Sequence, residues 1–597
     1  MDEKYSISNL SVSALLGLIE AGEIAIPEIQ RPFVWKRTKV RDLIDSMYNG
    51  YPTGYIIRWK SPNIKTKSGE KSDGKYLLID GQQRITALMT SILGIKIIDE
   101  DYNEKVIKIA FNPMAKDDES KFEVQDQSHI KSSKWIEDIS ILFKPEFSMM
   151  SFVKEYCEKN ADAQDTLIEK EIIKLTSIKN IQIGVVDLHA NINIDEVTEI
   201  FVRINSQGKI LKEADFAMSK IAADGENEGN WLRKVIDYFC HAAVKPTFYE
   251  FIVNKDKEFA SSEYATKIKW LKDNYDDIYD PDYNDMLRVS FAHKFYRGKL
   301  GQLVSLLSGR DFEARDYKQE IKENSFRLLK EGINNFINEY NFTQFVLAIQ
   351  SAGFVNSKMI NSQMTMDFAY ALFLMLHESD ELGKDEIKRY VRKWYVMSIL
   401  TGRYVSSPET AMDKDIREIR SKGFLKYFDE VEKAELSDTF WNVGLVQNLE
   451  TTATNSPYFS TYLAAQVFNG ERALFSQSEK VEDLINIAGD IHHIFPKDYL
   501  KKNGFNDKNK YNQVANYTFL DRPVNIVIGN DSPEVYFRKV FEKYLGEGRT
   551  MEEINNNLKV NCIPENIIDY KIDKYEVFLT DRRIMMAKKI ENYYKNL

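Results

Sequence analysis

Two histidines, His492 and His493, stand side by side in a chain of 597 residues that has only seven. They precede the apolar pair Ile494-Phe495, a pattern typical of the end of a strand. Neighbouring side chains on a strand point to opposite faces, so the two imidazoles can take different roles. A neutral imidazole, with a pKa near ~6.5, is a competent base at neutral pH and also binds metal ions. The pair is therefore a candidate for hydrolysis by a base together with a metal ion.

Two asparagines follow the histidine pair: Asn516 and, nine residues later, Asn525. This order and spacing resemble the HNH nuclease motif of the ββα-metal fold. The resemblance implies that His492 and Asn525 hold a metal ion, that His493 is the general base, and that Asn516 holds the intervening loop in place. Asp490 would serve as a further ligand or would orient His492.

Phosphodiester hydrolysis needs a deprotonated water molecule and a cation that neutralises the charge on the phosphate. No histidine follows His493, so a third imidazole ligand from the C-terminal segment is missing. We therefore expect a hydrated Mg²⁺ or Mn²⁺ ion rather than a closed zinc site. The alternative is a pair of ordinary strand-end histidines. The spacing of both asparagines, and a helix predicted to open at Ser532-Pro533, favour the nuclease interpretation.

Composition indicates a large globular protein. The length predicts three or more domains, and a hydrophobic content of 43% can fill several cores. The three cysteines lie far apart without a CxxC pair, which suits a reducing cytoplasm. The first residues form no apolar leader, and the longest apolar run, residues 368–376, is too short to span a bilayer. We expect a cytoplasmic protein that does not cross a membrane.

The net charge of −10 argues against a broadly basic surface for indiscriminate DNA binding. Any contact with DNA would then be confined to a local basic groove. One candidate groove lies in a segment of helical periodicity, where four cations stand close together: Lys388, Arg389, Arg392 and Lys393. The alternative for these cations is a solvated helix face.

Near the N-terminus, Pro27 and Pro32 exclude a helix and predict an extended segment. The segment presents four side chains suited to contact a nucleotide or modified DNA: Gln30, Arg31, Phe33 and Trp35. For the two aromatic residues the alternative is an anchor in the core.

A second polar motif follows the strand predicted for residues 75–80, where the chain enters a helix through Asp80, Gly81, Gln82, Gln83 and Arg84. The N-terminus of a helix offers free N–H groups, a glycine allows close approach, and an arginine supplies a guanidinium group. This combination predicts an anion site that suits a triphosphate, with the aspartate near an accompanying cation. The alternative is a capped helix with a surface arginine.

The Pro27 to Trp35 segment and the Asp-Gly-Gln-Gln-Arg box together resemble the N-terminal domain of GmrSD-type restriction endonucleases, modification-dependent (Type IV) enzymes of anti-phage defence. The resemblance implies a ParB/sulfiredoxin-like module that binds and hydrolyses an NTP (GTP, ATP or UTP). A second box, Phe201, Arg203 and Asn205, would complete the nucleotide site, with a simple interhelical turn as the alternative. Single-chain members that sense phosphorothioated DNA pair this module with a C-terminal HNH domain.

The predicted fold class is α+β with several domains. We expect a ParB-like nucleotide-binding and modification-sensing domain in residues 1–230, a helical connector in 231–440 and a ββα-metal HNH nuclease domain in 441–597. Within the connector, apolar periodicity predicts helices over residues 326–340 and 386–400.

These features predict an NTP-regulated HNH endonuclease or nickase acting on modified DNA, either phosphorothioated or carrying glucosylated hydroxymethylcytosine. One HNH site cuts one strand, so a double-strand break would need a homodimer or two nicks. Two other functions remain open: a nucleotide-gated DNA-binding regulatory protein with an inactive HNH site, and a toxin that cleaves RNA or host DNA.

Overall fold

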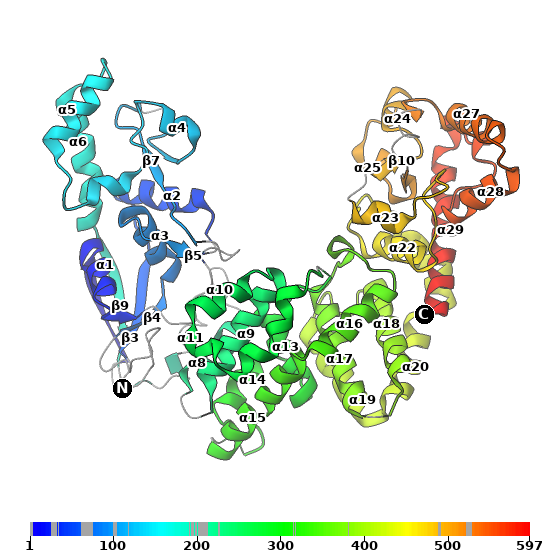
Figure 1. Ribbon diagram of the computed structural model, residues 1–597, viewed down its shortest axis with the longest axis horizontal. Helices are drawn as coiled ribbons and strands as arrows, with labels where there is room; N and C mark the ends of the chain where they lie inside the picture. The colour runs from blue at the N-terminus through cyan, green and yellow to red at the C-terminus, as the bar shows by residue number, and fades with distance from the viewer. Residues whose placement is uncertain are drawn as a thin grey trace. The chain divides into compact units, whose positions relative to one another are not determined.

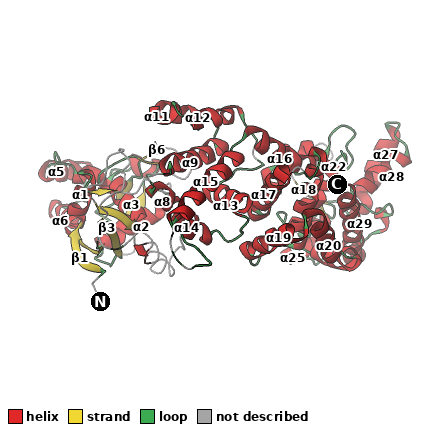
Figure 2. Cartoon of the chain, turned by 90° about the horizontal axis from the view of Figure 1, so that it is seen from below, coloured by secondary structure: helices red, strands yellow, loops and turns green. Residues whose placement is uncertain are grey.

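The computed structural model describes residues 4–597, apart from a set of internal segments: 26–32, 34, 61–75, 99–103, 117–118, 190–191, 193–195, 198–199, 201–212, 225–226, 277, 315, 317, 380, 488–490 and 521–527. The chain packs as two compact units, Met1–Gly225 and Glu226–Leu597. Strands gather in the first unit, and helices dominate the second (Figures 1 and 2). The predicted α+β class with more than one domain is confirmed; the ParB-like and HNH folds and the boundaries near 230 and 440 stay predictions.

The first unit is built around a mixed sheet of five strands in the order β1-β9-β3-β4-β2. These strands are β1 (Tyr5–Ser11), β2 (Ile24–Ala25), β3 (Tyr55–Lys60), β4 (Tyr76–Asp80) and β9 (Gln182–Leu188). The β1–β9 and β3–β4 pairs are antiparallel, whereas β9–β3 and β4–β2 are parallel. Because β3 is central and four of its six side chains are buried, the sheet is a rigid base for the loop that follows β4.

Three helices pack against this sheet: α1 (Val12–Glu20), α2 (Arg37–Tyr48) and α3 (Gln82–Ile92) (Figure 1). The apolar stripe of α2, which recurs at helical spacing, is buried: Val40, Leu43, Ile44 and Met47. The side chain of Ser11 accepts a hydrogen bond from the backbone N–H of Ala14 and caps α1. Of the three, α3 begins at the Asp80 to Arg84 motif, where the sequence predicts a helix.

The rest of the first unit consists of short strands and helices: β5 (Ile97–Ile98), β6 (Glu104–Lys105), β7 (Ile109–Phe111), β8 (Phe122–Val124), α4 (Gln127–Lys131), α5 (Met149–Lys159), α6 (Asp165–Thr176) and α8 (Glu213–Ala223). The core of the first unit runs from the sheet into these elements, and Phe111 and Phe122 stack within it at 5.0 Å between ring centroids.

The second unit begins with a long helical part (Figure 2). Its helices are α9 (Gly229–Val244), α10 (Phe248–Lys255), α11 (Lys257–Ala260), α12 (Glu263–Lys267), α13 (Tyr283–Phe295), α14 (Gly301–Leu307), α15 (Gln319–Phe336), α16 (Glu339–Ser351), α17 (Gln363–Ser379), α18 (Lys384–Thr401), α19 (Pro408–Lys422), α20 (Phe424–Glu435), α21 (Leu445–Asn448), α22 (Pro457–Phe468) and α23 (Val481–Asn486).

The single helix predicted for residues 326–340 is wrong at its C-terminal end. Helix α15 stops at Phe336, and a new helix, α16, begins at Glu339. The cause is Asn338, whose side chain accepts a hydrogen bond from the N–H of Asn341 and caps the second helix. The helix predicted for residues 386–400 is confirmed as the interior of α18.

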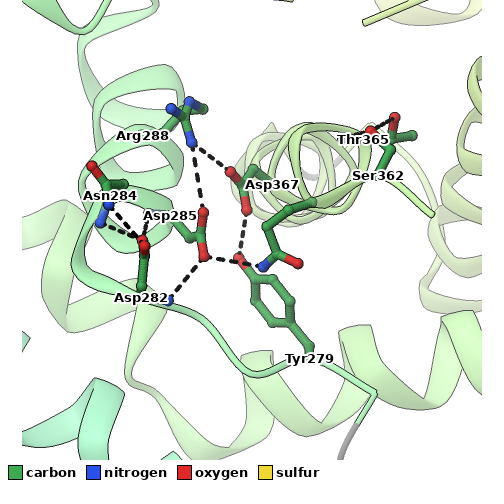
Figure 3. A network of polar contacts seen from close by, with 9 residues as sticks. Tyr279, Asp282, Asn284, Asp285, Arg288, Ser362, Thr365 and Asp367 are labelled. Atoms are coloured by element: carbon green, nitrogen blue, oxygen red, sulfur yellow. Dashed lines mark hydrogen bonds and ion pairs between the residues drawn. The ribbon is translucent and has the colours of Figure 1, made fainter. Parts of the chain in front are cut away.

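A buried polar network ties α13 to α17 (Figure 3). Arg288 of α13 donates to Asp367 of α17 at 2.8 Å and lies 3.6 Å from Asp285. Asp367 also accepts a hydrogen bond from the Tyr279 hydroxyl at 3.0 Å, and Asp285 accepts one from the Gln363 amide at 3.1 Å. Two carboxyl groups therefore share one guanidinium group. Burial is the main cause that raises the pKa of Asp285 to about 9, and the charge of Asp367 adds to the effect.

The C-terminal part of the second unit contains one hairpin and a set of helices. The strands are β10 (Ile491–His493) and β11 (Tyr517–Phe519), and the helices are α24 (Lys497–Lys502), α25 (Lys508–Tyr511), α27 (Pro533–Gly546), α28 (Met551–Val560) and α29 (Tyr575–Asn596). Helix α27 begins at Pro533, as the sequence predicts. None of the described helices combines the length and the apolar character needed to cross a membrane.

Candidate functional site

The histidine pair lies on a two-stranded antiparallel hairpin. His492 pairs with Thr518 and His493 with Tyr517, which places the two imidazoles on opposite faces of β10. The ring of His493 meets the ring of Tyr517 edge-on, with 5.1 Å between the centroids. The strand end predicted from the sequence is confirmed, and it separates the two side chains as two distinct roles require.

Asn516 holds the loop that leaves β10. Its side chain is fully buried, and its amide makes a closed pair of hydrogen bonds with Phe495, accepting from the backbone N–H at 2.8 Å and donating to the carbonyl at 3.1 Å. The same amide donates to the carbonyl of Tyr511 at 3.3 Å, and the Asn516 carbonyl accepts from the N–H of Ile494 at 2.8 Å. One buried side chain therefore fixes the strand that bears the histidines to the segment before β11.

Two further side chains fix the hairpin from the surrounding helices. The Tyr536 hydroxyl, from α27, donates to the carbonyl of Ile494 at 2.7 Å. Arg582 of α29 is fully buried and donates to the carbonyls of Ala515 and Tyr517 at 2.8 and 2.7 Å. A buried guanidinium group that bonds backbone carbonyls on both sides of Asn516 makes the hairpin part of the core rather than a free loop.

The imidazole of His493 is half-buried, and its Nε2 lies 3.0 Å from Oδ1 of Asn512. Burial, the largest cause, lowers the pKa of His493; the hydrogen bond to Asn512 opposes this effect, and the charge of Lys497 adds to it. The ring is therefore neutral at pH 7, the state in which an imidazole accepts a proton from water.

The predicted metal ligands are only partly described. His492 is placed on β10, whereas Asp490 and Asn525 lie outside the described residues. Among the described residues no group of three or more histidine, cysteine, aspartate or glutamate side chains is arranged to hold a metal ion. Mg²⁺ and Mn²⁺ prefer oxygen ligands and keep several waters, so such an ion would rely on the side-chain oxygens of Asp490 and Asn525 and on the phosphate, with His492 as its nitrogen ligand.

A group of exposed lysines surrounds the histidine hairpin, on α24, α25 and their flanks. Its members, called here the lysine surface, are Lys497, Lys501, Lys502, Lys508 and Lys510. The ion pairs found in the described part of the chain include none of them. In a protein of net charge −10 this is a local cationic surface. These lysines belong to no recognised motif, although five lysines within fourteen residues are a signal visible in the sequence.

In the first unit, the motif after β4 forms the predicted strand, turn and helix. Gly81 has φ 93° and precedes α3, a left-handed conformation that favours glycine. A Cβ atom there would lie 3.0 Å from the side chain of Ile56. Gln82 starts the helix and donates weakly to the Leu78 carbonyl at 3.4 Å. The first turn of α3 therefore stands directly at the end of the central sheet.

Arg84 is held close to this turn. Its Nη1 donates to the carbonyl of Tyr55 at 2.7 Å, and its guanidinium group lies against Gly54, where a Cβ atom would approach Nη2 to 2.9 Å. Burial lowers the pKa of Arg84, and the nearby charge of Asp80 offsets this only in part. The site thus contains a partly desolvated cation that an anion would stabilise. Gln83 lies beside it in the first turn of α3.

Five other residues are predicted to contact the nucleotide or the DNA. Gln30, Arg31, Phe201, Arg203 and Asn205 lie outside the described residues.

The two aromatic residues near them are placed. Phe33 is 4% exposed and packs in the core, in agreement with the alternative of an aromatic anchor. Trp35 is half-buried, 6.4 Å from Phe33 between ring centroids, with the ammonium group of Lys39 4.5 Å above its ring.

The candidate groove on α18 is mostly used for packing. Arg392 donates to the carbonyl of Leu597 at 3.2 Å, and Lys393 is 9% exposed and pairs with Glu432 at 3.1 Å. Lys388 and Arg389 lie nearer the surface. Two of the four cations of this helix therefore make contacts within the second unit. The lysine surface is the cationic region more accessible to DNA.

Comparison with known proteins relates both units to other chains. Residues 12–222 match the family model described as GmrSD restriction endonuclease, N-terminal domain. An uncharacterized protein of Methanocaldococcus jannaschii is 21% identical over 582 residues, covering 90% of this chain and 88% of that protein. The match over residues 12–222 includes the described turn Asp80 to Arg84. The first unit is therefore related in sequence to the N-terminal domain of GmrSD restriction endonucleases.

Proposed function

We propose that this protein is a metal-dependent DNA endonuclease or nickase of anti-phage defence, in which an NTP bound to the first unit regulates cutting by the second. The observation that carries the proposal is the set of buried hydrogen bonds that the Asn516 side chain makes with Phe495 and Tyr511, called here the Asn516 clamp. It holds a half-buried, neutral His493 on one face of β10 and leaves His492 on the other. The two imidazoles thus leave one rigid strand in different directions, so that each can take a role of its own at the scissile phosphate.

In the proposed mechanism, His493 takes a proton from the attacking water while its ring is kept in place by Tyr517 and Asn512. His492, with Asn525 and Asp490, would hold Mg²⁺ or Mn²⁺. The ion would neutralise charge on the phosphate and the leaving oxygen. The buried hydrogen bonds of Asn516 fix the backbone that carries His493. The base therefore loses little conformational freedom when the substrate binds.

The lysine surface supports nucleic acid as the substrate. Its five exposed ammonium groups flank β10, and lysine side chains bind phosphate oxygens through charge and hydrogen bonds. The overall negative charge of the protein opposes binding elsewhere. DNA would therefore be drawn to the hairpin rather than spread over the whole molecule, and affinity would fall steeply with salt.

The first unit supports regulation by a nucleotide. The triphosphate would lie at the N-terminus of α3, where Gly81 allows close approach and the partly desolvated Arg84 gains an anionic partner. Phe201, Arg203 and Asn205 would complete this site, and Gln30, Arg31 and Trp35 would contact the nucleotide or the DNA modification. The family match over residues 12–222 supports restriction as the biological role.

The test is nicking of supercoiled plasmid by the full chain with Mg²⁺, with and without each NTP. Plain, phosphorothioated and glucosylated hydroxymethylcytosine DNA are compared, with total RNA beside them. The proposal expects nicking of DNA that requires the metal and depends on a nucleotide or a modification. Cleavage of RNA in preference to every DNA would favour a toxin. NTP binding without cleavage of any substrate would favour a regulatory DNA-binding protein.

A charge variant tests the substrate contact. Replacing Lys501, Lys502 and Lys508 with glutamine should weaken DNA binding at least tenfold and flatten its dependence on salt, because each lysine lost removes one phosphate contact. The matched control replaces three exposed lysines of α19 and α20, Lys414, Lys426 and Lys433, with glutamine. Equal weakening in both sets would show that binding follows net charge alone, and the lysine surface would lose its role.

A further inference from the structure

Asn512 is absent from the sequence motif, yet it contacts the candidate base directly. It follows α25, and its Oδ1 lies 3.0 Å from Nε2 of His493. An amide oxygen has no proton to give, so the imidazole must be the donor in this hydrogen bond. With Nε2 carrying the hydrogen, the neutral ring keeps its lone pair on Nδ1.

The position of Asn512 is fixed by contacts of its own backbone and of the two residues before it. Directly before it, the carbonyl of Tyr511 accepts from the buried amide of Asn516 at 3.3 Å. One residue earlier, the carbonyl of Lys510 accepts from the Tyr575 hydroxyl of α29 at 3.0 Å. The backbone N–H of Asn512 donates to the carbonyl of Lys508 at 3.0 Å and closes α25. Asn512 is therefore held as firmly as the strand it faces.

Asn516 connects these contacts. The same amide group bonds Phe495, two residues after His493, and Tyr511, one residue before Asn512. A shift of either segment would break a hydrogen bond made by a fully buried polar group, which is costly. The distance between the His493 ring and the Asn512 side chain is thus set by one shared clamp rather than by two independent loops.

We propose that Asn512 is a positioning residue that holds His493 in the Nε2–H tautomer and leaves Nδ1 as the atom that takes the proton from water. This inference rests on the proposed nuclease function and adds to it an orienting group and the identity of the reacting nitrogen. Asn512 does not touch the substrate. It acts through the ring, in the way that a hydrogen-bonded partner fixes the tautomer of a catalytic histidine in other hydrolytic sites.

Three variants of the full chain test this role. Asn512→Ala removes the acceptor, Asn512→Asp keeps an oxygen acceptor at the same reach, and Asn509→Ala is the control, since Asn509 is an exposed amide on the same helix. Nicking rates are measured over a range of DNA concentrations at saturating Mg²⁺, which separates kcat from KM. The expected result is a loss of about 10- to 100-fold in kcat for Asn512→Ala with KM nearly unchanged, recovery to within a few-fold in Asn512→Asp, and no change in Asn509→Ala.

The tautomer is observed separately from activity, by ¹⁵N chemical shifts of the imidazole nitrogens in protein labelled at histidine. The His493 signals are assigned by their absence in His493→Ala. The wild type should show Nε2 protonated and Nδ1 bare, and Asn512→Ala should show exchange between both tautomers. An Nδ1–H tautomer in the wild type, or an unchanged tautomer and rate in Asn512→Ala, overturns the inference. A wild type with the expected tautomer but no cleavage of any substrate instead overturns the proposed function.

Discussion

The buried pair Asp285 and Asp367 gives a sharp prediction, because two chemically identical substitutions should have opposite effects. Burial and the charge of Asp367 raise the pKa of Asp285 to about 9, so Asp285 is protonated at pH 7 beside the carboxylate of Asp367. An asparagine at 285 keeps the shape, an oxygen for the Gln363 amide, and N–H groups for Asp367. We expect Asp285→Asn to stabilise the second unit.

The magnitude follows from linkage. In the unfolded chain an aspartate titrates near pH ~3.9, so holding the proton at pH 7 costs up to about 4 kcal/mol, since each of the roughly three pKa units is worth about 1.4 kcal/mol. The two carboxyl groups titrate together, so we expect a net gain of about 1 to 3 kcal/mol in Asp285→Asn. The raised pKa means that the wild type has this stability in full below about pH 4 and loses it as the pH rises toward 9. The advantage of the variant should grow over the same range.

Asp367→Asn is the counterpart. Asp367 is the carboxylate that Arg288 contacts at 2.8 Å and that accepts from Tyr279. Its neutralisation leaves a guanidinium group without its close anion, a loss of about 3 to 5 kcal/mol. Calorimetry of the second unit's transition at pH 5, 7 and 8.5 measures both variants. Destabilisation of Asp285→Asn to the same degree, or an effect independent of pH, would show that Asp285 is ionised in the folded protein.

Three further changes test other parts of the structure. Gly81→Ala should weaken NTP binding and destabilise the first unit by about 1 to 2 kcal/mol, because φ 93° is a left-handed conformation and the new Cβ meets Ile56. Titration calorimetry measures the binding and urea unfolding measures the stability. Unchanged values would contradict the proposed turn. Arg84→Gln should lower NTP affinity at least tenfold, measured by the same titration, and equal affinity would place the phosphates elsewhere. The hydrogen bond from His293 is the largest cause that lowers the pKa of Glu378 to about 2; Lys294 adds to it and burial opposes it. Glu378→Gln should therefore destabilise the protein above about pH 4.5 and lose this effect as the pH falls toward 2, and a constant difference in stability between pH 2 and 7 would argue against the ionised contact.

Local patterns predicted the elements that carry the sites, because each depends on residues close in sequence. The glycine before α3 and the proline that opens α27 are such patterns. The same reasoning failed at Asn338, where one capping side chain divides a continuous apolar pattern into two helices. Apolar periodicity indicates which face of a helix is buried, but it does not indicate where one helix ends and the next begins.

The long-range contacts could not be predicted in this way. Asn512 lies nineteen residues from His493, and Arg582 lies sixty-five residues from the Tyr517 carbonyl it binds. Neither pair belongs to a periodic pattern, and both depend on how α25 and α29 pack against the hairpin. The pairing of Asp285 with Asp367 was equally hidden, since either residue alone resembles a helix-surface carboxylate.

We propose that His493 is the base of a nuclease. This role is tested by the rate of Mg²⁺-dependent nicking of the responsive plasmid by the wild type, His493→Ala and His377→Ala. His377 is a half-buried histidine on α17, far along the chain from the hairpin. We expect His493→Ala to lose at least a hundredfold in rate while DNA and NTP binding persist, and His377→Ala to cut like the wild type. Equal nicking by the wild type and His493→Ala would contradict this role.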